Sequence, residues 1–305
     1  SMELLPHGNP VKDAPAGICD YFPSKKMLQL AKKYLPVDDS QPILNKERSI
    51  DGLFSIGSIG SIAQAYGSDI DCWVCLEEEK LGPENIKLLT AKLQAIEIFS
   101  DEKFNTEVHF FIVDLPSVRE DRYGGRDQES SGSAQGKILK EEFYRTMLHI
   151  AGKIPLWAVV PPSTDDNAYK YYNSIAERFP IDYFDIGSIS AIPKGEYFGA
   201  TIWQIFKSLK SPYKSVIKMS LLEKYIQDEG QQFLLCDKLK SDWSSGRGEM
   251  LNQDPYLMLF NEVLEYHRSI QQKEVELLLL ICFYLKLGDN SFGDLEKLVL
   301  GARKR

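Results

Sequence analysis

Residues 54–74 have the sequence Phe-Ser-Ile-Gly-Ser-Ile-Gly-Ser-Ile-Ala-Gln-Ala-Tyr-Gly-Ser-Asp-Ile-Asp-Cys-Trp-Val, and this stretch decides the fold that we expect. We interpret it as the end of a strand at 51–56, a glycine turn at 57–60, a short helix at 61–65 and a second strand at 69–76. Glycine marks the turn because it adopts backbone conformations that other residues avoid. The stretch therefore predicts a strand–turn–helix–strand unit.

The turn has the composition of a phosphate-binding loop. Gly57 and Gly60 have no Cβ, so the backbone can approach a phosphate closely. Free N–H groups at the start of the predicted helix favour an anion, and the hydroxyls of Ser58 and Ser61 add donors. We therefore expect these four residues to bind phosphate groups.

Asp69 and Asp71 open the second strand, and side chains two apart on a strand project from one face. Two adjacent carboxylates repel each other unless a cation lies between them. Magnesium prefers oxygen ligands and also binds the phosphate oxygens of a nucleotide. Two such ions about 4 Å apart can hold both reacting oxygens of a phosphoryl displacement. The pair predicts a site for two Mg²⁺ ions, with Mn²⁺ as a possible substitute.

A third carboxylate normally completes such a site, and the strand predicted at 107–113 offers two. Glu107 lies at the entry of this strand, where it can reach the aspartate pair. Asp114 lies at the opposite end and on the other face. We prefer Glu107 as the third ligand.

Lysines in the second half of the chain are candidates for binding a triphosphate. Pro212 predicts a break between two helices, because proline disrupts a helix interior. Lys214 and Lys218 still share a face at i, i+4, where like charges disfavour each other unless an anion lies nearby. Lys207 and Lys210 can instead complement the end of the first helix, as in an ordinary solvated face. Both interpretations of the lysines stay open.

The rest of the chain predicts an α+β protein with a mixed sheet of about five strands and flanking helices, followed by a helical domain. Residues 115–137 are rich in Ser, Gly, Arg and Asp, and we expect a long loop, either functional or a surface insertion. Further elements are helices at 25–34, 84–99 and 138–151, a strand at 156–160, and helices at 166–177, 195–209, 211–227, 231–241, 255–270 and 274–287. We divide the chain into an extended arm (1–23), an α/β domain (24–162) and a helical domain (163–305).

Composition limits the classes of function. The net charge is −8, which disfavours long nucleic acid as a partner, because phosphate contacts need a basic face. No apolar run reaches about 18 residues, so no transmembrane helix is expected. Five scattered cysteines indicate a reducing, cytoplasmic environment. Cys72 and Cys75 form a C-x-x-C motif, but on a strand they point to opposite faces, so we favour core packing over zinc or redox chemistry.

The segment 57–74 resembles the active-site signature of the DNA polymerase β-like nucleotidyltransferases. More of the chain is similar to the class I adenylate cyclases of gammaproteobacteria, in family order. The segments that carry this resemblance include Ser68-Asp-Ile-Asp-Cys-Trp-Val-Cys, Glu107-Val-His-Phe-Phe-Ile-Val-Asp, Glu142-Phe-Tyr-Arg-Thr, Glu196-Tyr-Phe-Gly-Ala, Asp254-Pro-Tyr and Cys282-Phe-Tyr-Leu-Lys.

This resemblance implies a polymerase β-like fold and a catalytic region that converts ATP to 3′,5′-cyclic AMP and pyrophosphate. It implies that Asp69, Asp71 and Glu107 bind metal and activate the ribose 3′-hydroxyl. It also implies that the Gly57–Ser58 turn and the lysines contact the triphosphate. Family members have a large regulatory part after the catalytic region, which we expect to lie outside this chain.

Two other functions are compatible with the residues. A nucleotidyltransferase could use the same carboxylates with a hydroxyl from a second substrate, which would require a second pocket or a basic groove. A nucleotide-binding module without activity would be expected to lack a carboxylate, and all of them are present.

Overall fold

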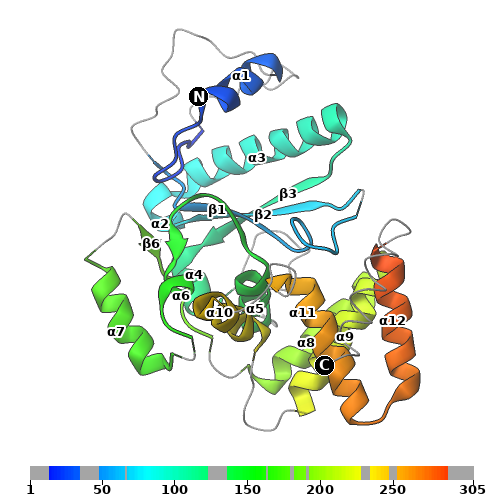
Figure 1. Cartoon of the computed structure of the whole chain (residues 1–305). Helices are drawn as coiled ribbons and strands as arrows, with labels where there is room; N and C mark the ends of the chain where they lie inside the picture. The colour runs from blue at the N-terminus through cyan, green and yellow to red at the C-terminus, as the bar shows by residue number, and fades with distance from the viewer. Residues whose placement is uncertain are drawn as a thin grey trace.

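The structure is a computed structural model that describes residues 14–34, 48–65, 67–122, 136–162, 164–178, 182–189, 192–227, 234–246 and 253–287. A sheet with one long helix along it occupies one part of the molecule, and a group of helices occupies the other (Figure 1). The predicted order, a mixed sheet with flanking helices followed by a helical region, is confirmed.

The described strands are β1 (Gly52–Ile56), β2 (Ile70–Leu76), β3 (Val108–Asp114), β4 (Leu148–Gly152), β5 (Ile154–Pro155) and β6 (Tyr183–Phe184). The helices of the first half are α1 (Lys25–Tyr34), α2 (Glu78–Leu81), α3 (Pro83–Phe104), α4 (Leu115–Arg119), α5 (Gly136–Thr146) and α6 (Leu156–Val159). Those of the second half are α7 (Asp166–Ala176), α8 (Lys194–Ser208), α9 (Pro212–Gln227), α10 (Leu235–Ser245), α11 (Pro255–Ser269) and α12 (Lys273–Leu287).

Among the described residues the main sheet has four strands in the order β3-β2-β1-β4. β1 is antiparallel to both of its neighbours, whereas β2 and β3 are parallel. The parallel pair is joined through α2 and α3, which fits the rule that parallel strands need a crossover helix. β5 and β6 form a separate two-stranded parallel sheet.

The two faces of the main sheet bury different sets of side chains. Val74 and Leu76 of β2 pack with α3 in one cluster. Trp73 and Cys75, one residue out of step, face the other cluster, where Trp73 stacks on Phe143 of α5 at 4.3 Å between ring centroids. Strand alternation gives this division. Asp69 and Asp71 therefore lie on the face that carries the helical region.

The helix predicted at 61–65 is not formed. Residues 57–65 instead make consecutive turns, in which the N–H groups of Ser61 and Gln64 donate to the carbonyls of Ser58 and Ser61. Gly57 and Gly60 have φ values of +87° and +75°, as the predicted glycine turn requires. We call residues 57–65 the glycine turn.

Two predictions for residues 138–160 are wrong. The helix predicted to reach residue 151 ends at Thr146, and Leu148–Gly152 forms β4 at the edge of the sheet. Pairing with β1, which is distant in sequence, decides this state. The strand predicted at 156–160 is the short helix α6, in which Trp157 stacks on Tyr144 at 4.2 Å. Short apolar runs do not distinguish a strand from a buried helix.

The loop predicted at 115–137 is partly helical. Its first five residues form α4, capped by Asp114, and its last two begin α5. Residues 123–135, which contain most of the predicted loop, lie outside the described residues.

The later helices follow the prediction closely, and α8 and α9 are separate, as Pro212 predicted. α10 runs from Leu235 to Ser245 rather than over 231–241. One cluster of buried apolar side chains includes Phe54, Phe143 and Phe283, so the sheet and the helical region share a core. No helix among the described residues is long and apolar enough to cross a membrane.

Candidate active site

The aspartate pair lies where β2 begins. Asp69 is exposed just before the strand, and Asp71 is its second residue and is partly buried. Asp71 pairs with Ile56, the last residue of β1, so the glycine turn leaves the sheet beside it. A Cβ built on Gly57 would lie 4.0 Å from Oδ2 of Asp71. The structure thus places the turn against the carboxylate that the sequence singled out.

The charge of Asp71 is under-compensated. Burial raises the pKa of its carboxyl, and the neighbouring Asp69 raises it further. Lys214, His109 and Lys207 lower the pKa but do not outweigh these effects. Neither aspartate forms an ion pair in the parts of the chain that the structure describes. A partly buried carboxylate without a close cation favours the binding of one.

Glu107 precedes β3 next to this pair. β2 and β3 are parallel, with Ile70 opposite Val108, and the N–H of Ile70 donates to the carbonyl of Glu107 at 2.9 Å. The side chain of Glu107 bonds to Nε2 of His109 at 2.9 Å and lies 3.8 Å from Nζ of Lys210. It is on the same strand face as Asp71 by alternation. Its role as third ligand stays a prediction.

Asp114, the alternative to Glu107, lies at the far end of the parallel pair, opposite Leu76. Its side chain accepts hydrogen bonds from the N–H groups of Ser117 and Glu78, at 3.2 and 2.9 Å. The carboxylate therefore caps α4 and ties it to α2, away from the aspartate pair.

The side chains present fit a divalent cation that prefers oxygen. Asp69 and Asp71 are two carboxylates one residue apart, and the pKa of Asp71 is raised first by burial and then by Asp69. A cation between them would oppose both effects. Across the described ranges, no three acidic, histidine or cysteine side chains already form a closed metal-binding group. A bound ion would therefore take part of its coordination from Glu107 after a rearrangement, or from a ligand.

The backbone of the glycine turn is held by the protein itself. The N–H of Gly57 donates to Oγ1 of Thr146 at 3.1 Å, and that of Ile62 donates to Oδ2 of Asp254 at 2.6 Å. The N–H of Gly60 donates to the side chain of Gln64 at 2.9 Å. These donors are not the free helix-start groups that the sequence predicts. Ser58 is buried, and the hydroxyl of Ser61 donates to the carbonyl of Ser58 at 2.7 Å, so the binding of an anion here stays a prediction.

The candidate lysines divide into two groups. Lys207 and Lys214 lie near enough to Asp71 to lower its pKa. Their ammonium groups lie 5.1 Å from the ring centroid of Trp203 and 5.5 Å from that of Tyr256, distances typical of cation–π contacts. Neither has an ion pair among the described residues, so both remain available to an anion.

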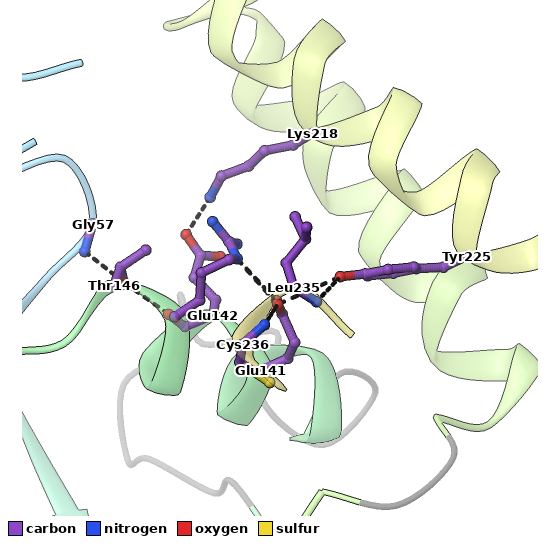
Figure 2. Close-up of polar contacts among 9 residues, drawn as sticks. Gly57, Glu141, Glu142, Thr146, Lys218, Tyr225, Leu235 and Cys236 are labelled. Carbon is purple, nitrogen blue, oxygen red and sulfur yellow. Dashed lines mark hydrogen bonds and ion pairs between the residues drawn. The ribbon is translucent and has the colours of Figure 1, made fainter. Parts of the chain in front are cut away.

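Lys218 belongs to the second group, because it is already paired. Its Nζ lies 2.5 Å from Oε1 of Glu142 in α5, and both side chains are mostly buried (Figure 2). Burial opposes ionisation of Glu142, but Lys218, Arg145 and Lys214 outweigh it and lower the pKa to about 2. Lys218 thus belongs to a buried ion pair, and it also lines the small hollow beside Lys214.

Glu142 is part of a buried network around α5 (Figure 2). Nε of Arg145 donates to Glu141 at 3.1 Å, and each of these two side chains is 3% exposed. Glu141 also accepts from the N–H of Cys236, and Tyr225 accepts from the N–H of Leu235 at 3.0 Å. The segment Glu142-Phe-Tyr-Arg-Thr therefore links the glycine turn, through Thr146, to α9 and α10.

Sequence reasoning missed three side chains near the site. Lys286 of α12 and Tyr256 of α11 line a small hollow together with Lys214. The hydroxyl of Tyr256 is buried and has no hydrogen-bond partner among the described residues. Asp254 contacts the glycine turn. All three lie in segments that the family resemblance includes, but only the tertiary structure brings them to the aspartate pair.

The C-x-x-C motif packs in the core. Cys72 is 4% exposed and Cys75 is fully buried. Burial raises the pKa of both thiols, to about 11 for Cys72. High thiol pKa values and burial oppose metal binding and redox exchange, in agreement with the predicted core packing.

The sequence matches two families of protein domain. Residues 4–158 match the "Adenylate cyclase NT domain" family and residues 192–297 match "Adenylate cyclase, class-I, second domain". The chain is 34% identical to an adenylate cyclase of Salmonella typhimurium over 284 residues, which cover 90% of this chain and 33% of that protein. It is 34% identical to the adenylate cyclase of Escherichia coli K12 over 281 residues, with the same coverage.

The adenylate cyclase of Proteus mirabilis is 35% identical over 283 residues, which are 90% of this chain and 32% of the relative. The chain thus spans about a third of the length of the curated relatives it matches. No solved structure matches it.

Proposed function

The chain belongs to the class I adenylate cyclase family, and we propose that it is the catalytic region, which converts ATP to 3′,5′-cyclic AMP and pyrophosphate in the cytoplasm. The observation that carries the proposal is the position of Asp69 and Asp71. They lie beside the glycine turn, with Lys207 and Lys214 close enough to influence the pKa of Asp71. A nucleoside triphosphate with divalent cations matches this combination of acidic and basic groups.

We assign Asp69, Asp71 and Glu107 as ligands of two divalent cations, Mg²⁺ or Mn²⁺. When bound, such ions supply positive charge beside the α-phosphate and favour ionisation of the ribose 3′-hydroxyl. Asp71 lies opposite His109 in the parallel pair β2 and β3, and Asp69 and Glu107 immediately precede these two strands. The proximity of the two strand starts supports a shared site. The under-compensated charge of Asp71 supports this assignment.

The remaining residues orient the triphosphate. Ser58 and Ser61 contact phosphate oxygens, Gly57 lets the backbone approach them without a Cβ in the way, and Lys207, Lys214 and Lys218 balance their charge. In the reaction the 3′-hydroxyl loses its proton and its oxygen bonds to the α-phosphorus. The bond from that phosphorus to the bridging oxygen breaks, and pyrophosphate leaves. Holding the two reacting atoms of one molecule in line is the main task of the protein.

The test is incubation of the purified chain with ATP and Mg²⁺ or Mn²⁺, followed by chromatography of the nucleotides. Wild type is expected to form cyclic AMP, whereas Asp69→Asn and Asp71→Asn are not. Asp101→Asn, an exposed change on α3, serves as the control and should retain full activity. Absence of cyclic AMP from wild type under both metals, together with absence of ATP binding, would contradict the proposal.

A further inference from the structure

One carboxylate joins the glycine turn to the helical region. Oδ2 of Asp254 accepts the N–H of Ile62 at 2.6 Å, across 192 residues of sequence. Oδ1 accepts the N–H groups of Tyr256 and Leu257, both at 2.9 Å, and so caps α11. One oxygen of Asp254 therefore caps α11, and the other holds the glycine turn.

The contact falls on the part of the turn that needs an external partner. Ser61 and Gln64 satisfy their N–H groups within the turn, and Gly57 at its start is held by Thr146. Ile62 lies between these points and donates to the helical region. A hydrogen bond to an ionised acceptor is stronger than one between neutral groups, so it restrains this backbone effectively.

The helix that supplies the carboxylate also belongs to the site. α11 packs against α9 and α12, which carry Lys214 and Lys286. Tyr256, two residues after Asp254, lines the hollow with these lysines. A movement of α11 would therefore shift the turn and the lysines together.

We propose that Asp254 is a positioning residue that holds the glycine turn in the conformation that receives the triphosphate. The inference rests on the proposed function, because it assumes that this turn binds ATP. Asp254 itself need not touch the nucleotide. Its side chain acts by restraining the backbone of residues 58–65.

The decisive variant is Asp254→Asn. Asparagine is as good an N-cap as aspartate, so its oxygen can keep the cap of α11. Its amide nitrogen then faces the N–H of Ile62, donor against donor, and the contact to the turn is lost. The matched control is Asp165→Asn, because Oδ1 of Asp165 caps α7 in the same way, with distances of 2.9 and 2.8 Å.

Two measurements separate positioning from a purely structural role. The first is the dissociation constant of ATP with Mg²⁺ by calorimetry, which should rise about 10-fold in Asp254→Asn and stay within about twofold in Asp165→Asn. The second is hydrogen–deuterium exchange of a peptide over 58–65 without nucleotide, which should accelerate only in Asp254→Asn. Asp254→Ser, which keeps a capping oxygen but not the second acceptor, should show the same two changes to a smaller degree.

Equal ATP affinity in Asp254→Asn and Asp165→Asn would overturn the inference while leaving the proposed function intact. Unchanged exchange at 58–65 would overturn it as well, since the turn would then not depend on the carboxylate. A wild-type chain that binds no ATP would refute the proposed function, and this inference with it. The absence of ATP binding can be distinguished from the other two results, because it is seen with the wild-type chain alone.

Discussion

Two groups of carboxylates and cations that lie beside α9, one open and one buried, have opposite electrostatics. In the buried group, Glu142 faces Lys218 and Arg145, and its pKa is lowered to about 2. In the open group, Asp71 faces Asp69 at the start of β2, and its pKa is raised by burial and by that neighbour. Both groups include lysines of α9, so the difference lies in how completely the acids are paired.

This difference indicates which group is available to a ligand. A carboxylate with close cations and low pKa already has its partners, and its removal disturbs the fold. A carboxylate with raised pKa and only distant lysines gains most from an added cation. Variants of the two groups should accordingly separate stability from activity.

The largest expected effect is in the buried group. Arg145→Met leaves Glu141 and Glu142 without their guanidinium, and loss of one partner of a buried pair costs about 3–5 kcal/mol. Urea unfolding measures the change. Lys80→Met, which removes an exposed pair with Glu77, should cost less than about 1 kcal/mol. Equal losses in the two variants would show that the buried network is not a structural element.

The next largest effect is expected in the open group, where a variant should lose activity but not stability. Asp71→Asn should lower the turnover of ATP more than about 100-fold if Asp71 is a metal ligand as proposed, because loss of such a ligand exceeds the 10–100-fold cost of changing a residue behind it. Its melting temperature should remain equal to wild type or rise, since the ionised carboxyl is disfavoured in the fold. Activity assays and thermal unfolding test both parts. A large drop in stability would show that Asp71 has a structural role like that of the buried group.

The pH dependence of stability should have opposite signs for the two acids. The pKa of Glu142 is lowered from 4.5 to about 2, so its stabilisation is complete above about pH 4.5 and is lost as pH falls toward 2. The pKa of Asp71 is raised from 3.8, so its contribution is present below that value and is lost as pH rises through the raised pKa.

Glu142→Gln should therefore remove about 2–3 kcal/mol of the stability at neutral pH and flatten the loss in acid. Asp71→Asn should leave the loss of stability in acid unchanged, and its stability at neutral pH should be equal to that of wild type or higher. Unfolding by urea at a series of pH values measures both. Parallel pH profiles for the two variants would contradict the comparison.

The smallest effect concerns the turn between the two groups. Gly57 has φ of +87° and Gly67 has φ of +79°, so alanine at either position costs about 1–2 kcal/mol of strain. No atom beside Gly67 obstructs a Cβ, and the nearest to Gly57 is Oδ2 of Asp71 at 4.0 Å. Only Gly57→Ala should also raise KM for ATP, as initial-rate measurements would show. An equal KM for ATP in both variants would show that the glycine turn does not take part in binding ATP.

The local pattern was enough to predict most of the framework. The alternating pattern predicted β2, which begins at Ile70, so that Asp71 is in the strand and Asp69 immediately precedes it. Pro212 separated α8 from α9. Strand periodicity and proline geometry depend on neighbouring residues only, so they can be read from sequence. The C-x-x-C motif was assigned to the core for the same reason.

Long-range pairing overrode the local pattern elsewhere. Leu148–Gly152 extends the sheet although it continues a helical period, because β1 offers an edge. The short run 156–159 became helical where Trp157 could stack on Tyr144. Neither partner is visible in the local sequence.

The sequence by itself determined the order of the candidate groups, namely a glycine turn followed by two aspartates at the start of a strand, because residue type and spacing are local properties. Tertiary structure alone decided which donors and cations are already satisfied. It paired Lys218 with Glu142, left Lys214 open, and bound Ile62 to Asp254. Such pairings join residues up to 192 positions apart, and their distances depend on the packing of whole elements rather than on local propensity.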